Sequence, residues 1–157
     1  FLAVVELCRE ADIALQPTFV TFTPWTTLES YTELLRVLAE NDLVESVAPI
    51  QLAIRLLIPA GSRLLELDEV RHMVAPFDEA ALVFPWRHAD PRVDALCEEV
   101  AQSVRTGEQL NVLRARIFAR ICDAASDAAG IPSLWQCPAP PLVARAAIPY
   151  LNEPWYC

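Results

Sequence analysis

A near-continuous apolar run, VAPIQLAIRLLI, occupies residues 47–58 and decides which fold class to expect. A strand of this kind is typical of a parallel sheet, where both faces are covered. A second β-type segment, rich in β-branched and aromatic side chains, lies at residues 13–22. Between the two, Thr26 and Glu29 form a capping-box pattern, and apolar residues at helical spacing continue to about Asn41. Strand, helix and strand in this order predict a right-handed βαβ unit and therefore an α/β fold.

The following segments add helices to this unit. A short helix is expected from Asp68, and a third strand at residues 80–84. Asp90 followed by Pro91 is a strong helix start, because aspartate caps a helix and proline is tolerated at the first helical position. A last helix is expected over residues 106–130, opened by a capping box and closed by a glycine.

The charge balance argues against two classes of partner. The chain has 12 arginines and no lysine against 21 acidic residues, which gives a net charge of −9. A surface this acidic repels phosphate backbones and anionic headgroups, so we expect neither nucleic acid nor a membrane as partner. No apolar run approaches the roughly 20 residues that span a bilayer.

The cysteine pattern indicates a reducing compartment. The five cysteines are scattered, and no two have the spacing of metal ligands. An odd number of dispersed cysteines does not resemble a secreted disulfide framework. We therefore expect a cytoplasmic protein with buried thiols and no metal site in this chain. The cysteines are Cys8, Cys97, Cys122, Cys137 and Cys157.

The first residues already follow a helical pattern. Leu2, Val5 and Cys8 recur at helical spacing, and no capping residue precedes them. We therefore expect the natural protein to continue upstream.

Two groups of residues are candidates for a functional site. Gln51 and Arg55 interrupt the apolar run at a spacing that places them on one face of a strand. A buried arginine needs a partner, which is either an acidic neighbour such as Glu33 or a carboxylate ligand. The second group, Trp86-Arg87-His88, directly follows the expected third strand, where α/β folds place functional groups. Simple packing at a sheet edge is the alternative for this second group.

Three segments together resemble the radical S-adenosylmethionine enzymes. They are PTFVTFTPWTTLESY at residues 17–31, IQLAIRLLIPAGSRLL at 50–65, and FPWRHADPR at 84–92. The second segment contains the P-x-G-[ST]-x-L turn of these enzymes, although the first loop lacks their usual glycines. With the closing EPWYC, the closer resemblance is to a bacterial subgroup whose tails end in C-C-A-E-P or Cys-selenocysteine-A-E-P.

The resemblance implies a fold and a division of the chain. Residues 1–89 would form the C-terminal half of a partial (β/α) barrel with parallel strands. Residues 90–131 would form a helical extension, and residues 132–157 a C-terminal strap rich in proline and tryptophan, which holds six of the 13 prolines. The resemblance implies one partner above all, the missing N-terminal half of the barrel. Open strand edges also predict self-association.

The resemblance also implies a chemistry that this chain does not complete alone. The C-x-x-x-C-x-x-C motif of the family is absent, so no cofactor is expected in this fragment. The full-length protein would use a 4Fe-4S cluster and S-adenosylmethionine to generate a 5′-deoxyadenosyl radical for hydrogen abstraction. Gln51 and Arg55 would face the methionine carboxylate or the substrate, and the backbone at Leu57 and Ile58 would flank the adenine. The Trp86–His88 group would lie on the substrate side.

The last residue is a candidate redox group. In the resembling subgroup, the cysteine at the position of Cys157 is followed by cysteine or by selenocysteine, which UGA encodes. Cys157 would then be the first member of a vicinal redox pair, and the chain a selenoprotein candidate. The alternative is an arbitrary cut of a longer chain at this residue.

A second function is compatible with the same sequence. The chain would then be a non-catalytic, acidic α/β interaction module that recognises a protein partner through its Trp-rich strap. An upstream reading frame containing the three cysteines would distinguish the enzyme from the module.

Overall fold

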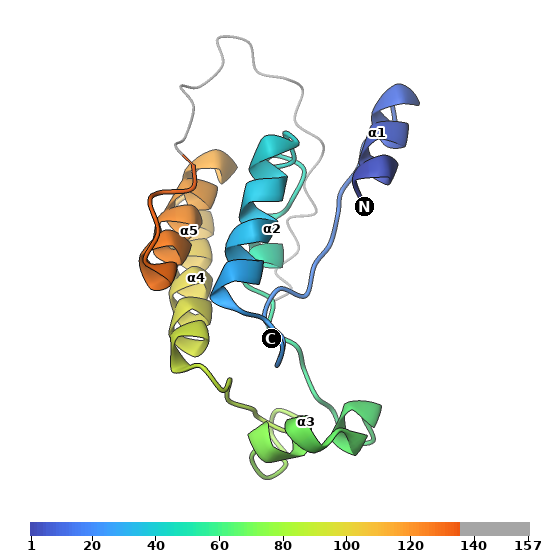
Figure 1. The fold of residues 1–157 in the computed structure, drawn as a ribbon, viewed down its shortest axis with the longest axis vertical. Coiled ribbons are helices and arrows are strands. Elements are labelled where there is room, and N and C mark those ends of the chain that lie inside the picture. The colour runs from blue at the N-terminus through green and yellow to red at the C-terminus, as the bar shows by residue number, and fades with distance from the viewer. Residues whose placement is uncertain (136–157) are drawn as a thin grey trace.

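The computed structural model describes residues 1–135, which form helices joined by extended segments (Figure 1). The α-helices are α1 (Leu2–Glu10), α2 (Leu28–Glu40), α3 (Asp68–Met73), α4 (Pro91–Gln109) and α5 (Arg114–Ala129). Two short 3₁₀ helices, η1 (Pro49–Leu52) and η2 (Arg63–Glu66), lie between α2 and α3.

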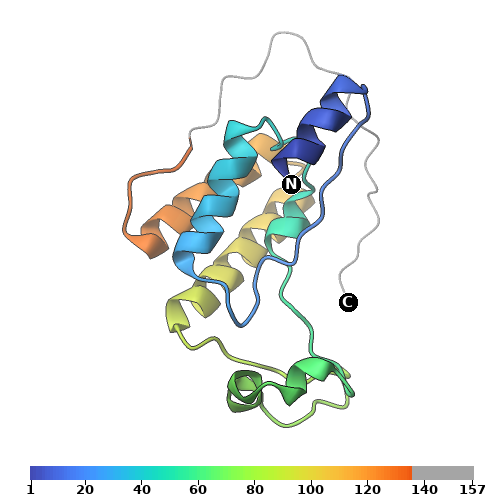
Figure 2. The same ribbon diagram turned by 45° about the vertical axis from the view of Figure 1, so that its right-hand side comes forward.

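The main core lies between α2, α4 and α5, which run side by side in both views (Figures 1 and 2). The apolar periodicity of α2 explains its position, because the residues at helical spacing are the ones that are buried. The Tyr31 ring stacks on Phe22 at 4.8 Å, and its hydroxyl donates to the Leu52 carbonyl at 2.8 Å. The buried α2 residues are Leu28, Tyr31, Thr32, Leu35 and Leu38.

A glycine lets α4 and α5 approach each other closely. A Cβ atom placed on Gly107 would lie 2.6 Å from Cγ1 of Ile117, closer than non-bonded carbons approach. Ile117 is almost completely buried. The absence of a side chain at Gly107 therefore sets the distance between these helices.

A second, smaller cluster lies beyond the bundle, within residues 56–87. Ile58, Val70 and Trp86 are its buried members. Single antiparallel bridges, such as those from Pro59 to Val83 and from Val74 to Trp86, join its extended segments. We call residues 56–87 the small lobe.

The predicted α/β fold, a partial barrel half with parallel strands, is wrong for residues 1–135. This part of the chain is mostly helical and contains isolated β-bridges but no sheet. The run at 47–58 starts as η1, because Pro49 lacks an amide for a ladder but fits the first turn of a helix. Residues 13–22 are extended, yet only Phe22 forms a bridge, a parallel one to Arg55. Residues 80–84 form a turn with one bridging residue, Val83.

Several predicted helix ends are confirmed and others shift. Asp90 caps α4 by accepting from the Arg92 amide, as predicted. Gly130 ends α5 with a φ of 67°, in the left-handed region where glycine is favoured. The cap of α2 is Thr27 rather than Thr26, and a helix does not begin at residue 106, because α4 continues through it.

The C-terminal strap is described only as far as Trp135. The Trp135 ring packs edge-on against the Phe118 ring, with the ring centroids 5.0 Å apart. The remaining residues of the predicted strap, Cys157 among them, lie outside the described part of the chain. Within residues 1–135, no helix combines the length and apolarity needed to cross a bilayer.

Candidate functional site

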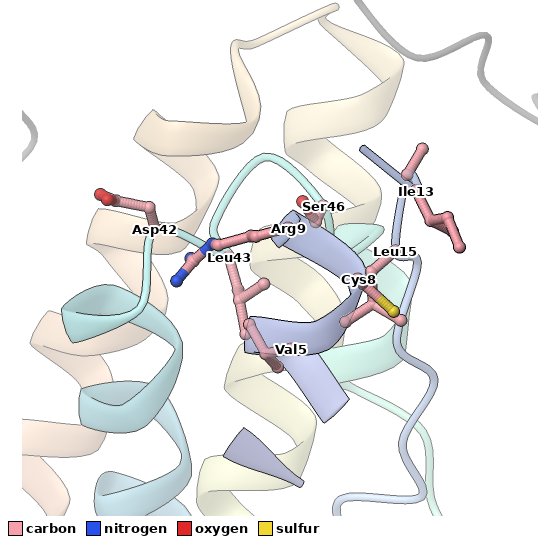
Figure 3. Close-up of a pocket in the computed structure, with 9 residues that line it drawn as sticks. Val5, Cys8, Arg9, Ile13, Leu15, Asp42, Leu43 and Ser46 are labelled. Atoms are coloured by element: carbon pink, nitrogen blue, oxygen red, sulfur yellow. The ribbon is translucent and has the colours of Figure 1, made fainter. Parts of the chain in front are cut away.

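A pocket of about 390 Å³ lies between α1 and the loop that follows α2 (Figure 3). Val5 and Leu43 lie on its apolar side, and Arg9 reaches across from α1 to donate to the Asn41 carbonyl. Of the predicted site residues within 1–135, none lines this pocket.

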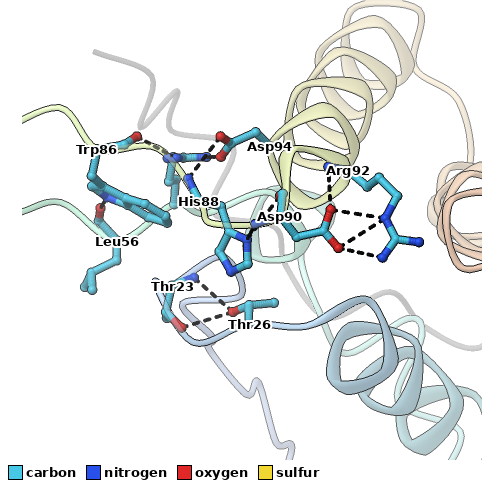
Figure 4. Close-up of polar contacts among 9 residues, drawn as sticks. Thr23, Thr26, Leu56, Trp86, His88, Asp90, Arg92 and Asp94 are labelled. Carbon is cyan, nitrogen blue, oxygen red and sulfur yellow. Dashed lines mark hydrogen bonds and ion pairs between the residues drawn. The ribbon is translucent and has the colours of Figure 1, made fainter. Parts of the chain in front are cut away.

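Three of the predicted residues, Arg55, Trp86 and His88, lie instead where the bundle meets the small lobe (Figure 4). Phe22 and Arg55 form the parallel bridge, with the Leu56 amide donating to the Phe22 carbonyl at 2.8 Å. The Arg55 guanidinium lies 3.7 Å from the centre of the Trp86 ring. Three segments that are far apart in sequence therefore meet at Arg55.

The guanidinium of Arg55 is held by neighbours within the chain. Its Nη1 lies 2.8 Å from Asp94 Oδ1, and its Nη2 donates to the Trp86 carbonyl at 2.7 Å. The side chains of Arg55 and Asp94 are 29% and 23% exposed. Burial leaves Asp94 Oδ1 without another partner, so the ion pair compensates its charge. Of the two alternatives for Arg55, the geometry favours the internal ion pair, with Asp94 in place of Glu33, which pairs with Arg36.

The face of the Trp86 indole ring contacts the Arg55 guanidinium. The residue is 7% exposed, and its indole Nε1 donates to the Leu56 carbonyl at 2.8 Å. The indole therefore satisfies its single donor and presents its face to a cation, which is the favourable geometry for a cation–π contact.

His88 lies at the start of α4, on the other side of the ion pair. Its backbone amide donates to Asp94 Oδ2 at 3.0 Å. Its Nδ1 lies 2.9 Å from the Asp90 amide nitrogen and accepts from it. Nδ1 also lies 3.1 Å from the Asp90 carbonyl oxygen, and in the tautomer that carries its proton on Nε2 that nitrogen can donate to another partner.

Figure 4 also shows Thr23 and Thr26, which are joined to each other by hydrogen bonds. The Thr26 hydroxyl donates to the Thr21 carbonyl at 2.8 Å, so it accepts from the Thr23 hydroxyl at 3.0 Å. These bonds hold the FTPWTT loop at the entrance to α2. The sequence marked this loop through the capping-box pattern of Thr26 and Glu29 and through the resemblance, but not through these hydroxyl contacts.

Four predicted residues line a second pocket of about 210 Å³. They are Arg55, Leu57, Ile58 and Trp86. Leu57 is exposed, whereas the Ile58 side chain is buried in the small lobe. Four of the eight predicted residues therefore lie together, although not on a sheet, and Cys157 lies outside the described residues.

Gln51 and Arg87 do not join this pocket. Gln51 lies in η1, and its Oε1 accepts from the Phe19 amide at 3.1 Å. Arg87 is exposed, and its backbone amide donates to the Met73 carbonyl at 3.1 Å. The shared strand face predicted for Gln51 and Arg55 is therefore not present.

Asp94 is the functional residue that sequence reasoning missed. It lies in the first turn of α4, directly after the buried Val93. An acidic residue beside the buried face of an amphipathic helix is a signal for a buried pair. Nothing in the sequence, however, indicated that its partner would be Arg55.

Two of the described thiols, Cys97 and Cys122, are poor ligands and poor nucleophiles. Burial raises the pKa of Cys122 to about 12. Burial also raises the pKa of Cys97, against the opposing effect of the Arg55 guanidinium beside it. Among residues 1–135, no group of three or more His, Cys, Asp or Glu side chains is arranged to hold a metal ion.

Comparisons with protein-family models, curated proteins and solved structures found no match to this chain.

Proposed function

We propose that this chain is part of a radical S-adenosylmethionine enzyme. The observation that carries the proposal is the meeting of its three resembling segments, around Phe22, Arg55 and Trp86. Segments 31 or more residues apart have no local reason to converge, and convergence of polar and aromatic groups beside a pocket is typical of a binding site.

In this proposal Arg55 is a positioning residue. Its guanidinium is occupied by Asp94 and by the Trp86 carbonyl, so it fixes the pocket wall rather than receiving a ligand carboxylate. The backbone amide and carbonyl of Leu57 bond to no described residue, and this segment is the wall that would flank the adenine. His88, with Nε2 available, is the substrate-side group that would donate a hydrogen bond.

The described residues do not fit an iron–sulfur cluster. Such a cluster needs thiolates, whereas the pKa values of Cys97 and Cys122 are raised and no ligand group is present among residues 1–135. The cluster ligands would come from another part of the full-length protein. When bound there, the cluster and S-adenosylmethionine would supply the 5′-deoxyadenosyl radical.

Sequencing the gene upstream of the Phe1 codon tests the proposal at little cost. We expect the reading frame to continue through three cysteines in C-x-x-x-C-x-x-C spacing. An initiation codon close to Phe1 without that motif would contradict the proposal and leave the non-catalytic interaction module as the function to test.

A further inference from the structure

The chain turns back along α5 after that helix ends (Figures 1 and 2). The Ile131 amide donates to the Ser126 carbonyl at 3.0 Å, and the Leu134 amide donates to the Ser126 hydroxyl at 3.2 Å. The next residue, Trp135, already contacts Phe118. Phe118 lies eight residues before Ser126, which is about 12 Å along a helix. The C-terminal strap therefore runs toward the start of α5 at the point where its described part ends.

This first part of the strap is anchored by packing as well as by hydrogen bonds. The Trp135 and Phe118 rings meet at an interplanar angle of 84°, the edge-to-face arrangement that aromatic pairs favour. Phe118 is buried, and Leu134 and Trp135 pack against the main core. The Ser133 hydroxyl also donates to Asp123 Oδ1 at 2.9 Å. The residues after Trp135 therefore start from a fixed position beside α5.

Two exposed leucines lie ahead of the strap, in the turn between α4 and α5. Leu110 is 69% exposed and Leu113 is 61% exposed, although both side chains are large and apolar. Large apolar side chains that are exposed together are typical of a contact surface. We call Leu110 and Leu113 the turn leucines. Their exposure among residues 1–135 leaves room for a segment that lies outside that range.

The residues after Trp135 can reach the turn leucines. Phe118 is five residues from Leu113, which is about 7.5 Å along α5. An extended, proline-containing chain advances about 3.1 Å per residue. Residues 136–138 therefore span this distance, and residues 138–141 are then level with the turn.

The same residues suit an apolar surface. Residues 136–144 contain no Asp, Glu, Lys or Arg, although the whole chain carries a net charge of −9. They include Pro138, Pro140 and Pro141. Because proline rings fix φ, an extended segment that contains them loses less conformational entropy when it binds.

We propose that residues 136–141 continue along α5 and cover the turn leucines, with residues 138–141 packed on them. The strap of the same chain is the occupant because Trp135 holds it beside the turn, and a tethered segment has a far higher effective concentration than a separate molecule. A second copy would instead bring two chains of net charge −9 together.

Disulfide formation between two introduced cysteines tests this proposal in the full 157-residue chain. The test pair is Leu110→Cys with Pro140→Cys, and the control pair is Ile131→Cys with Pro140→Cys. Ile131 is 40% exposed and lies near Ser126, on the side of the Trp135 contact that faces away from the turn leucines. A strap that moves freely beyond Trp135 would reach both partners, whereas a docked strap reaches only Leu110→Cys.

The rates of the two pairs decide the outcome. Cys8, Cys137 and Cys157 are replaced by serine in both proteins, whereas Cys97 and Cys122 are buried and stay. With oxidised glutathione as oxidant, we expect the test pair to form its intramolecular disulfide at least about tenfold faster than the control pair, because docking raises the effective concentration of its thiols. Equal rates, or a faster control pair, would overturn the proposal. Disulfides between molecules in the test pair would assign the turn to a second copy and would also overturn it.

A further variant tests whether the turn leucines themselves make the contact. Leu113 occupies the N-cap of α5 without a side-chain cap bond, and aspartate is favoured there, so Leu113→Asp should keep α5 folded while it removes the apolar contact. Added to the test pair, it should lower the disulfide rate toward that of the control pair, whereas Leu113→Ile should not. Circular dichroism checks that both variants are folded. A disulfide rate that Leu113→Asp leaves unchanged would overturn the assignment of this surface.

Discussion

Arg55 and Asp94, 39 residues apart in the chain, form a 2.8 Å ion pair where the two buried clusters of residues 1–135 meet. Asp94 belongs to α4 in the helical bundle, and Arg55 rests on Trp86 of the small lobe. This ion pair and the bond from the Leu56 amide to the Phe22 carbonyl both link the small lobe to the bundle, beside the pocket of about 210 Å³.

Substituting Arg55 should show how much stability is lost when the Asp94 carboxylate has no charged partner. We expect Arg55→Leu to lower the free energy of unfolding by about 2 kcal/mol, because the Asp94 carboxylate loses its compensation. The double variant Arg55→Leu/Asp94→Asn should recover part of this loss, since asparagine is neutral and still accepts from the His88 amide. Urea denaturation measures both.

The control for this ion pair is Arg36→Leu. Arg36 pairs with Glu33 and Glu40 on an exposed face, where such pairs contribute little, so the loss of stability should be much smaller than in Arg55→Leu. Equal losses of stability in Arg36→Leu and Arg55→Leu would show that the loss in Arg55→Leu does not come from an uncompensated Asp94 carboxylate.

The close approach of α4 and α5 predicts the effect of adding one methyl group at Gly107. Gly107→Ala should destabilise the chain by about 1–3 kcal/mol, because the new Cβ would overlap Ile117 in the buried contact between α4 and α5. Repeating the substitution in an Ile117→Ala background should reduce its cost. Thermal melts compare the two, and an undiminished cost in that background would contradict the close approach.

The cap of α2 can be assigned by substitution. The Thr27 hydroxyl accepts from the Ser30 backbone amide, and the Ser30 hydroxyl accepts from the Thr27 backbone amide. We expect Thr27→Ala to cost about 1 kcal/mol of stability, and Thr27→Ser much less, because serine retains the acceptor. Similar chemical-denaturation midpoints for the two variants would argue against this cap.

Alkaline pH should weaken the fold. Burial raises the pKa of Cys122 from 9.0 to about 12, and burial also raises the pKa of Tyr31 well above its usual value. The protonated thiol is thus favoured in the folded chain, so its contribution is complete below pH 9 and is lost as the pH rises toward 12. Urea midpoints at about pH 8–10.5 should fall more steeply in wild type than in Cys122→Ala, with Cys8→Ala as control. Equal slopes in wild type and Cys122→Ala would contradict this.

The sequence identified helices better than it identified strands. The face of α2 and the Asp90-Pro91 start of α4 follow from spacing and capping, which are local properties. A strand also needs a partner, which local pattern does not supply. Residues 13–22 are accordingly extended but bridge only at Phe22, and the apolar run at 47–58 starts as a 3₁₀ helix.

Individual residues of the candidate site were predicted from the sequence, but the contacts between them were not. Arg55 and Trp86 were singled out, and the structure stacks one on the other. Choosing Asp94 among 21 acidic residues required the three-dimensional arrangement, because a pair this distant leaves no mark in local sequence.

Formation of 5′-deoxyadenosine tests the proposed function most directly. The full-length protein would be reconstituted anaerobically with iron and sulfide, reduced, and incubated with S-adenosylmethionine, and the product measured by chromatography and mass spectrometry. We predict 5′-deoxyadenosine that requires both the cluster and the upstream cysteines. A reconstituted, reduced protein with an intact 4Fe-4S signal that forms no 5′-deoxyadenosine, with or without candidate substrates, would contradict the account.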